Sequence, residues 1–136
     1  MTLSTTDRTL YPSGSPFEAA VGFSRAVRVG PFVFVSGTTA SGPDGPVGGG
    51  DPERQTAEVL ARIAAALKEA GSDVSQVVRT RVYLTDIAHF EAVARAHAAV
   101  FGDIRPASAF VEVSALAHPA LLVEVEADAI VPQSGA

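Results

Sequence analysis

The chain has 136 residues, the size of one ordinary domain that buries most of the apolar surface it makes. It contains no cysteine, which excludes a disulfide framework, a thiolate metal site and a cysteine nucleophile. Its net charge of −5 lacks the basic surface of a nucleic-acid binder, so we expect no nucleic-acid partner. Without an apolar run near roughly 18 residues or a signal-peptide pattern, we expect no membrane association and a cytoplasmic location.

The first half of the chain is punctuated by glycine and proline. Residues 1–16 are polar and contain two prolines, which predicts a surface arm or a loosely attached first strand. Two β-rich runs at 26–30 and 31–37 are separated by Gly-Pro, which predicts a hairpin. Residues 41–50 are predicted to form a flexible loop, without the Lys-Ser/Thr ending of a phosphate-binding loop. We interpret residues 1–136 as a single domain.

A helix is predicted to start at Asp51, because its side chain can accept the free amide hydrogens and Pro52 suits the first helical position. It is expected to run to Gly71. Its apolar residues follow helical spacing on one side: Val59, Leu60, Ile63, Leu67 and Ala70. The next run, residues 77–84, predicts a strand with one apolar face, comprising Val78, Thr80, Val82 and Leu84.

A second helix is predicted after Asp86 and is expected to end at Gly102. Its apolar stripe contains Phe90, Val93, His97 and Phe101. The segments 105–116 and 122–130 alternate with period 2 and predict two strands. The predicted fold class is therefore α+β, a mixed sheet with both helices on one face. The other face collects charged residues, which suggests oligomerisation: Arg79, Arg81, Glu124, Glu126 and Asp128.

Several motifs in this order resemble those of the reactive-intermediate deaminase family, also called Rid or YjgF. They are Gly22-Phe-Ser-Arg-Ala-Val27, Val35-Ser-Gly37, Gln55-Thr56, Val82-Tyr-Leu-Thr-Asp86, Phe101-Gly102, Arg105-Pro-Ala107 and Val123-Glu-Val-Glu126. The resemblance covers about residues 17 to 131. It implies a chorismate-mutase-like or ferredoxin-like fold assembled as a homotrimer, with the sheets forming an inner barrel and ligand sites between subunits. It also implies a small-molecule substrate, and we expect no cofactor.

Archetypal members of that family hydrolyse reactive enamines and imines, such as 2-aminoacrylate, to a 2-keto acid and ammonia. An arginine of a Pro-Ala-Arg motif holds the substrate carboxylate, but here Pro106-Ala107 is followed by Ser108. Other departures include Phe23 for a tyrosine, Ala94 for an asparagine and Phe110 for a frequent cysteine. These differences place the chain in a divergent branch without the arginine, for which we expect poor activity on 2-aminoacrylate.

Other family positions are retained. The resemblance implies that Glu124 orients or deprotonates the attacking water and that Ser36 and Gly37 line the pocket. The alternative role of Glu124 is a salt bridge to Arg79 or Arg81 inside the oligomer. The pocket is expected to be bordered by Phe23, Ser108 and Phe110.

The missing guanidinium has two possible substitutes, Arg105 and Arg25. Arg25 has the parity of Val27 and Val29, which favours a packing role. His97 lies on an apolar stripe, which favours a satisfied, half-buried histidine over a catalytic one. No trio of His, Asp and Glu has metal-ligand spacing, so no metal site is predicted.

Three functions stay open from the sequence. The first is an enamine or imine deaminase-like hydrolase acting on an unidentified substrate. The second is a non-catalytic homotrimer that binds a small metabolite. The third, a ribonuclease, is disfavoured by the acidic composition.

Overall fold

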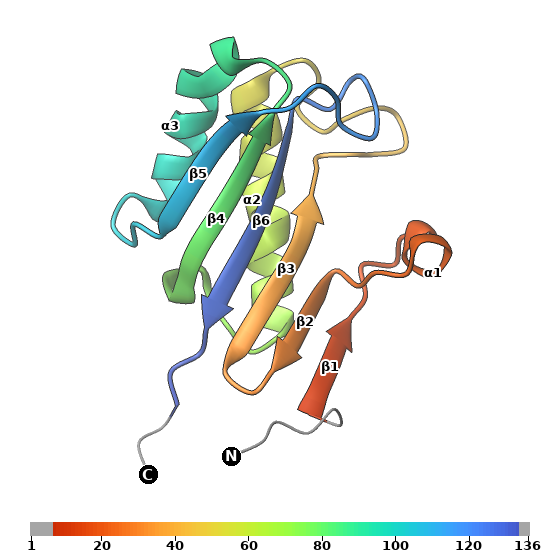
Figure 1. Ribbon diagram of the computed structural model, residues 1–136. Coiled ribbons are helices and arrows are strands. Elements are labelled where there is room, and N and C mark those ends of the chain that lie inside the picture. The colour runs from red at the N-terminus through yellow and green to blue at the C-terminus, as the bar shows by residue number, and fades with distance from the viewer. Residues whose placement is uncertain (1–6, 134–136) are drawn as a thin grey trace.

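The computed structural model describes residues 7–133, which form one six-stranded sheet in the order β1-β2-β3-β6-β4-β5 (Figure 1). The strands are β1 (Arg8–Tyr11), β2 (Ala26–Val29), β3 (Phe32–Thr38), β4 (Val77–Leu84), β5 (Ala107–Glu112) and β6 (Val123–Ile130). Only β4 and β5 pair in parallel, and the other neighbours are antiparallel. Gly30 and Pro31 make the predicted β2–β3 hairpin turn, where Gly30 takes a positive φ of 59°.

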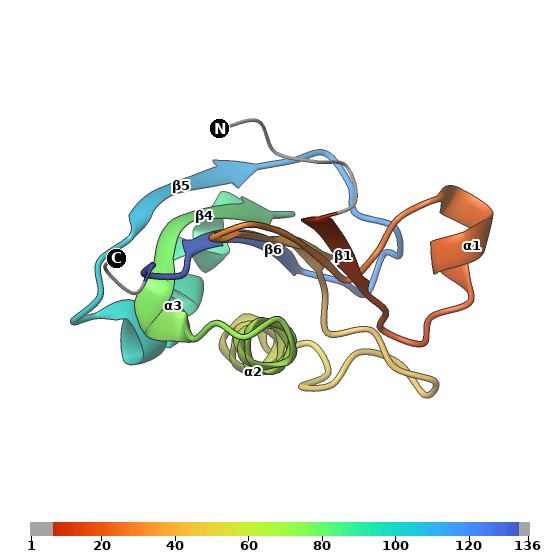
Figure 2. The same cartoon turned by 90° about the horizontal axis from the view of Figure 1, so that it is seen from below.

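The helices are α1 (Phe17–Val21), α2 (Pro52–Glu69) and α3 (Phe90–Phe101), with short 3₁₀ turns η2 (Val74–Gln76) and η3 (Ile87–His89). Figure 2 shows α2 and α3 on the same side of the sheet. This confirms the predicted α+β class. The predicted stripe of α2 is buried in full against the sheet: Val59, Leu60, Ile63, Leu67 and Ala70. The opposite side of the sheet, here called the open face, has no helix over it (Figure 2).

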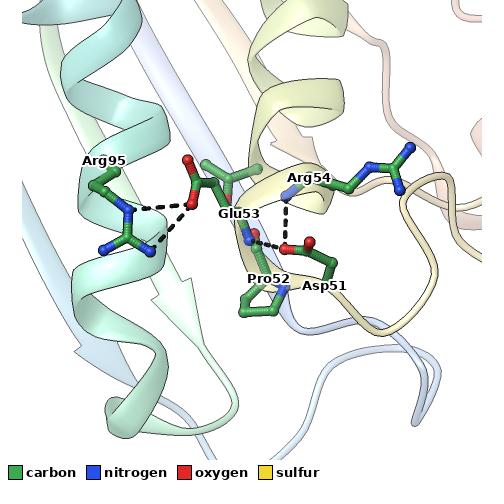
Figure 3. A network of polar contacts seen from close by, with 6 residues as sticks. Asp51, Pro52, Glu53, Arg54 and Arg95 are labelled. Carbon is green, nitrogen blue, oxygen red and sulfur yellow. Dashed lines mark hydrogen bonds and ion pairs between the residues drawn. The ribbon is translucent and has the colours of Figure 1, made fainter.

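The start of α2 holds the two long helices together. Asp51 accepts hydrogen bonds from the amides of Glu53 and Arg54 at 3.0 and 3.2 Å, as the cap prediction requires (Figure 3). Glu53 in turn forms an ion pair with Arg95 of α3, with 3.1 Å between Oε1 and Nη2. The N-terminal turn of α2 is therefore linked to the middle of α3.

The predicted face of strand β4 is wrong at its start. Val78 is 44% exposed and Val77 is buried, because the pairing with β6 shifts register between Val77 and Arg79. Such a bulge places two residues of one strand opposite one of its partner and reverses the side-chain parity before it. From Thr80 onward the predicted parity holds, and Thr80 itself is buried.

The end of α3 also differs from the prediction. Gly102 keeps a right-handed φ of −56°, so this glycine does not terminate the helix by a left-handed turn. Arg105 takes the left-handed conformation instead, with φ 59°, and its amide donates to the carbonyl of Phe101. At the other end of the helix, Phe90 lies on the predicted stripe but is 43% exposed.

The predicted N-terminal arm is partly ordered structure. Its residues 8–11 form β1, which pairs with β2, and α1 follows without having been predicted. Residues 1–6 of that arm lie outside the described residues. Between residues 7 and 133 no helix combines the length and the apolar character needed to cross a bilayer.

Candidate functional site

Glu124 lies on the open face, at the end of the sheet where β3 leaves its partner. Its β4 neighbour is Tyr83, and the β3–β6 register shifts between Val35 and Thr38. This irregularity brings Gly37 against the carboxylate. A Cβ at Gly37 would lie only 2.7 Å from Oε2 of Glu124, so a glycine is needed for this approach. The structure thus brings together Glu124 and the predicted Ser36-Gly37 pair.

The carboxyl of Glu124 has no partner of its own. It is half-buried, and it makes no hydrogen bond or ion pair within residues 7–133. Burial is the main reason why the pKa of Glu124 is raised, and the nearby charge of Glu126 adds to this, while Arg25 opposes it. A carboxyl that resists ionisation in this way is suited to exchanging protons.

The alternative salt bridges of Glu124 are not formed within the chain. Arg81 pairs with Asp128, with 3.3 Å between Nη1 and Oδ2, and Arg79 is also opposite Asp128 across the strands. The hydroxyl of Tyr83 donates to Glu126, and this bond is the main reason why the pKa of Tyr83 is raised. The carboxylates of Glu126 and Asp128 therefore have partners on the open face, whereas Glu124 does not.

Arg25 is the cation beside this carboxyl. Its Nη1 donates to the carbonyl of Gly37 at 3.2 Å and to Oγ1 of Thr38 at 2.9 Å. Burial is the main reason why its pKa is lowered, with Glu18 and Glu124 acting in the opposite direction. These bonds hold Arg25 against β3, in line with the packing role expected for it. The alternation of side chains along the strand did not indicate how near Arg25 lies to Glu124.

The remaining residues of this region are held by backbone contacts. Ser36 donates its hydroxyl hydrogen to the carbonyl of Ser24, and its amide donates to the carbonyl of Arg25. Phe23 is half-buried directly after Gly22, which ends α1 in a left-handed conformation with φ 89°. Ser36 therefore fastens β3 to the segment before β2, which keeps Gly37 in place.

Ser108 and Phe110 lie on the other side of the sheet. Oγ of Ser108 is 2.7 Å from Oγ1 of Thr80, and Thr80 is 2.9 Å from Nε2 of His97 on α3. The ring of Phe110 meets Phe90 and His97 edge-on, with centroids 5.3 and 5.2 Å apart. Phe110 and Glu124 leave opposite faces of the sheet, so they do not meet within one chain, and the predicted pocket between subunits stays a prediction.

His97 matches its predicted structural character. It is 9% exposed, bonded to Thr80 and packed against Phe101, and burial lowers its pKa. Arg105 is exposed, and its side chain makes no hydrogen bond or ion pair within the described chain. It precedes the end of β5 that pairs with Arg79, away from Tyr83 and Glu124. Within one chain, Arg25 and not Arg105 lies near the carboxyl.

The surface of the described chain has two hollows, of about 300 and 390 Å³, and neither is lined by Glu124. The first is lined by Val47, Gly48, Arg54, Ala57 and Glu58, and the second by Phe90, Glu91, Ala94, Arg95 and Ala98. Within residues 7–133 no group of three or more His, Asp and Glu residues is placed to hold a metal ion.

Comparisons with known proteins give one consistent family. Residues 13–131 match the family model described as Endoribonuclease L-PSP. An uncharacterized protein of Streptomyces coelicolor is 40% identical over 117 residues, covering 86% of this chain and 87% of that protein. The chloroplastic Reactive Intermediate Deaminase A of Arabidopsis thaliana is 36% identical over 100 residues, covering 72% of this chain and 54% of that protein.

The structural comparison agrees. The crystal structure of Rv2704 from Mycobacterium tuberculosis, described as a member of the YjgF/YER057c/UK114 family, superposes with a TM-score of 0.84. It is 53% identical in sequence, and the match covers 91% of this chain and 99% of the other.

Proposed function

This chain belongs to the Endoribonuclease L-PSP family, which includes the YjgF and RutC proteins, and we propose that it is a small-molecule hydrolase of the enamine or imine deaminase type. The observation that carries the proposal is Glu124, a half-buried carboxyl with a raised pKa and no partner among the described residues. A relative from Arabidopsis thaliana bears the name Reactive Intermediate Deaminase A, which supports this reaction class.

The chemistry follows from one proton acceptor. The ionised carboxylate of Glu124 takes a proton from water as the water oxygen adds to the carbon of a protonated imine, and the C=N electron pair moves to the nitrogen to give a neutral amine. Glu124 then returns this proton to the nitrogen, the C–N bond breaks with release of ammonia, and the hydroxyl proton passes to the Glu124 carboxylate as the carbonyl forms. A carboxyl whose pKa lies above its ordinary value is a stronger base toward water, and a pKa nearer the working pH suits a group that both accepts and returns a proton.

We propose that a homotrimer completes the site. The open face carries an apolar patch, defined here as Phe32, Phe34 and Ile130, which are 39%, 48% and 43% exposed. These residues are neighbours across β3 and β6, so the patch is continuous. Burial of such a patch against another copy favours assembly. An adjacent copy would supply the Ser108 and Phe110 region to the Glu124 region, which one chain separates.

The substrate proposed is one that does not need a clamped carboxylate. Ser108 occupies the position of the family's arginine, and we propose that the chain belongs to a branch without this group. RNA is not the proposed substrate despite the family's description, because the net charge of −5 opposes binding to phosphates. Cleavage of RNA by the purified protein would contradict this exclusion.

The test compares two carboxylates on the same strand and face. Glu124→Gln is expected to lower turnover by about 10²–10⁴-fold while leaving the assembly unchanged. Glu126→Gln keeps an acceptor for Tyr83 and serves as the control. Turnover is measured on a panel of imines generated in situ by amino-acid oxidases. Equal losses in both variants, or lost assembly of Glu124→Gln with no substrate found, would contradict the catalytic role. A ligand bound without turnover of any imine would favour the metabolite-binding alternative.

A further inference from the structure

A chain of hydrogen bonds runs from the surface of β5 to the interior beside α3. It starts at the exposed Ser108, passes through Thr80, which is 1% exposed, and ends at His97. The two links measure 2.7 Å between hydroxyl oxygens and 2.9 Å between Oγ1 and Nε2. Oγ of Ser108 also lies 3.0 Å from the carbonyl oxygen of Pro106. The proposed hydrolysis does not use this series of hydrogen bonds.

The buried end of this series of hydrogen bonds is the ring of His97, which is closely packed and uncharged. The ring of His97 lies between Phe101 and Phe110, with centroid distances of 4.8 and 5.2 Å. Burial lowers the pKa of His97, so the neutral ring prevails at neutral pH. A neutral ring offers one donor and one acceptor nitrogen. Thr80 is therefore held by a buried, neutral partner that contacts two aromatic rings.

The number of available hydroxyl hydrogens decides whether Ser108 can donate a hydrogen bond to a ligand or only accept one. A serine hydroxyl has one hydrogen and two lone pairs. If Ser108 donates to Pro106, Thr80 donates to Ser108 and His97 donates to Thr80, then one lone pair of Ser108 stays free. If Ser108 donates to Thr80 and Thr80 donates to His97, two lone pairs stay free. In both arrangements the hydrogen of Ser108 is held by Pro106 or by Thr80, so Ser108 can donate to a ligand only by giving up one of these bonds.

We propose that Ser108 is a hydrogen-bond acceptor, kept so by its bonds to Pro106 and to the Thr80–His97 pair, that recognises an N–H donor on the substrate instead of a carboxylate. A guanidinium carries only donors, and an ionised carboxylate carries only acceptors, so the two suit each other. A carboxylate facing the lone pairs of Ser108 would be left without a donor. An amide or amine nitrogen would be satisfied. The location of this contact beside Glu124 rests on the proposed function, but the acceptor character rests on the bonds of a single chain.

This inference narrows the substrate class. The molecule would be an imine or enamine that carries a carboxamide or amino group at the position where a 2-imino acid carries its carboxylate. Thr80 and His97 are positioning residues in this account, because they set the direction of the Ser108 hydroxyl without touching the substrate.

The test uses pyruvate and pyruvamide, which differ in replacing a carboxylate by a carboxamide. Binding is measured by titration with NMR detection of ring-labelled histidine; the chain has 3 histidines, and His97→Gln assigns the signal. Pyruvamide is expected to bind about tenfold more tightly than pyruvate and to shift the His97 ring signals. Ser108→Ala should reduce this preference to about parity, whereas Ser41→Ala in the exposed loop should keep it.

Thr80→Val tests the positioning role. This variant cuts the path to His97, so pyruvamide should no longer shift the His97 signals and the preference should fall. Failure of pyruvamide to bind, equal or tighter binding of pyruvate, or an unchanged preference in Ser108→Ala would overturn the inference. Turnover is scored separately: a pyruvamide preference without any imine hydrolysis would sink the proposed function and leave this inference standing.

Discussion

The polar groups on the two faces of the sheet differ in whether they have hydrogen-bonding partners. On the open face, Glu124 stands half-buried beside Gly37 without a hydrogen bond or ion pair in the described chain. On the helix face, the polar atoms of Ser108, Thr80 and His97 bond one another in sequence. An unpartnered carboxyl with a raised pKa is costly to keep, whereas a satisfied chain of neutral groups stabilises its surroundings.

This difference indicates where chemistry and where recognition would take place. The open face has the group that can exchange a proton, and the helix face has the group whose hydrogen-bond direction is fixed. The sheet separates the two regions within a single chain. The experiments below act on one region at a time.

The largest effect is expected from Phe34→Glu, which acts on the apolar patch. Phe34 is exposed in one chain and pairs with Asp128, so a new carboxylate would meet a like charge and be buried on assembly. The proposed trimer, three times 13.9 kDa, should not form in this variant, and turnover should be lost. Light scattering coupled to size-exclusion chromatography measures the mass. Val47→Glu in the loop, 46% exposed, is the control, and an assembled Phe34→Glu protein would refute the role of the patch.

Next in size is Gly37→Ala, which displaces the carboxyl without removing it. The added Cβ would lie 2.7 Å from Oε2 of Glu124, and the end of this flexible side chain can swing away. Turnover should fall about 100-fold, because small misplacements of a reacting group have effects of this order. Stability should change little. Gly50→Ala has no atom within 4 Å of the new Cβ and is the control. Steady-state rates equal to wild type would show that the position of Glu124 does not matter.

The helix face is altered by Ser108→Arg, which replaces an acceptor with a donor of five hydrogens. A charge-assisted contact to a carboxylate contributes about 1.5–3 kcal/mol, so hydrolysis of 2-aminoacrylate should rise by about 10–100-fold. Thr80 keeps His97 as its partner in this variant. Ser41→Arg in the loop controls for the added charge. An unchanged rate would mean that the missing guanidinium is not what limits this substrate.

Much of the fold could be predicted from the sequence, because it depends on local patterns. The burial of Leu60 and Ile63, the cap at Asp51 and the alternation of β6 each follow from the spacing of neighbouring residues. The bulge at Val77 could not be predicted, since it is a relation between β4 and β6. The left-handed Arg105 is likewise unexpected, because a non-glycine residue seldom takes this conformation.

The candidate site could be predicted in part. The resemblance implied that Ser36 and Gly37 line the same pocket as Glu124, and Gly37 lies against the Glu124 carboxylate in the structure. The sequence did not determine on which side of the sheet Phe110 lies. Alternation divides the side chains of an edge strand between two sides, but it does not tell which side meets the helices. The nearness of Arg25 to Glu124 depends on the hairpin and the β3 irregularity together.

The smallest expected effect concerns stability, and its sign separates the two roles of Glu124. The folded protein raises the pKa of Glu124 above the ordinary value of 4.5, so the folded state holds this proton more tightly than the unfolded state. The stability from this group is therefore present below the unfolded pKa and lost as pH rises through the folded pKa. At pH 7 Glu124→Gln should melt about 1–3 °C higher than wild type, and near pH 4 the two should coincide.

Asp73→Asn is expected to change the melting temperature in the opposite direction. The amide of Ser75 is the main reason why the pKa of Asp73 is lowered, so its stabilising contribution is present above the unfolded pKa and lost as pH falls. This variant should melt lower than wild type at pH 7. Melting is followed by circular dichroism from pH 4 to 8 at one protein concentration, since assembly makes the melting temperature depend on it. A Glu124→Gln protein that melts well below wild type at pH 7 would show that the carboxylate is a counter-ion inside the oligomer. Its raised pKa would then be a property of the isolated chain alone, and the proton transfer assigned to it would lose its physical basis.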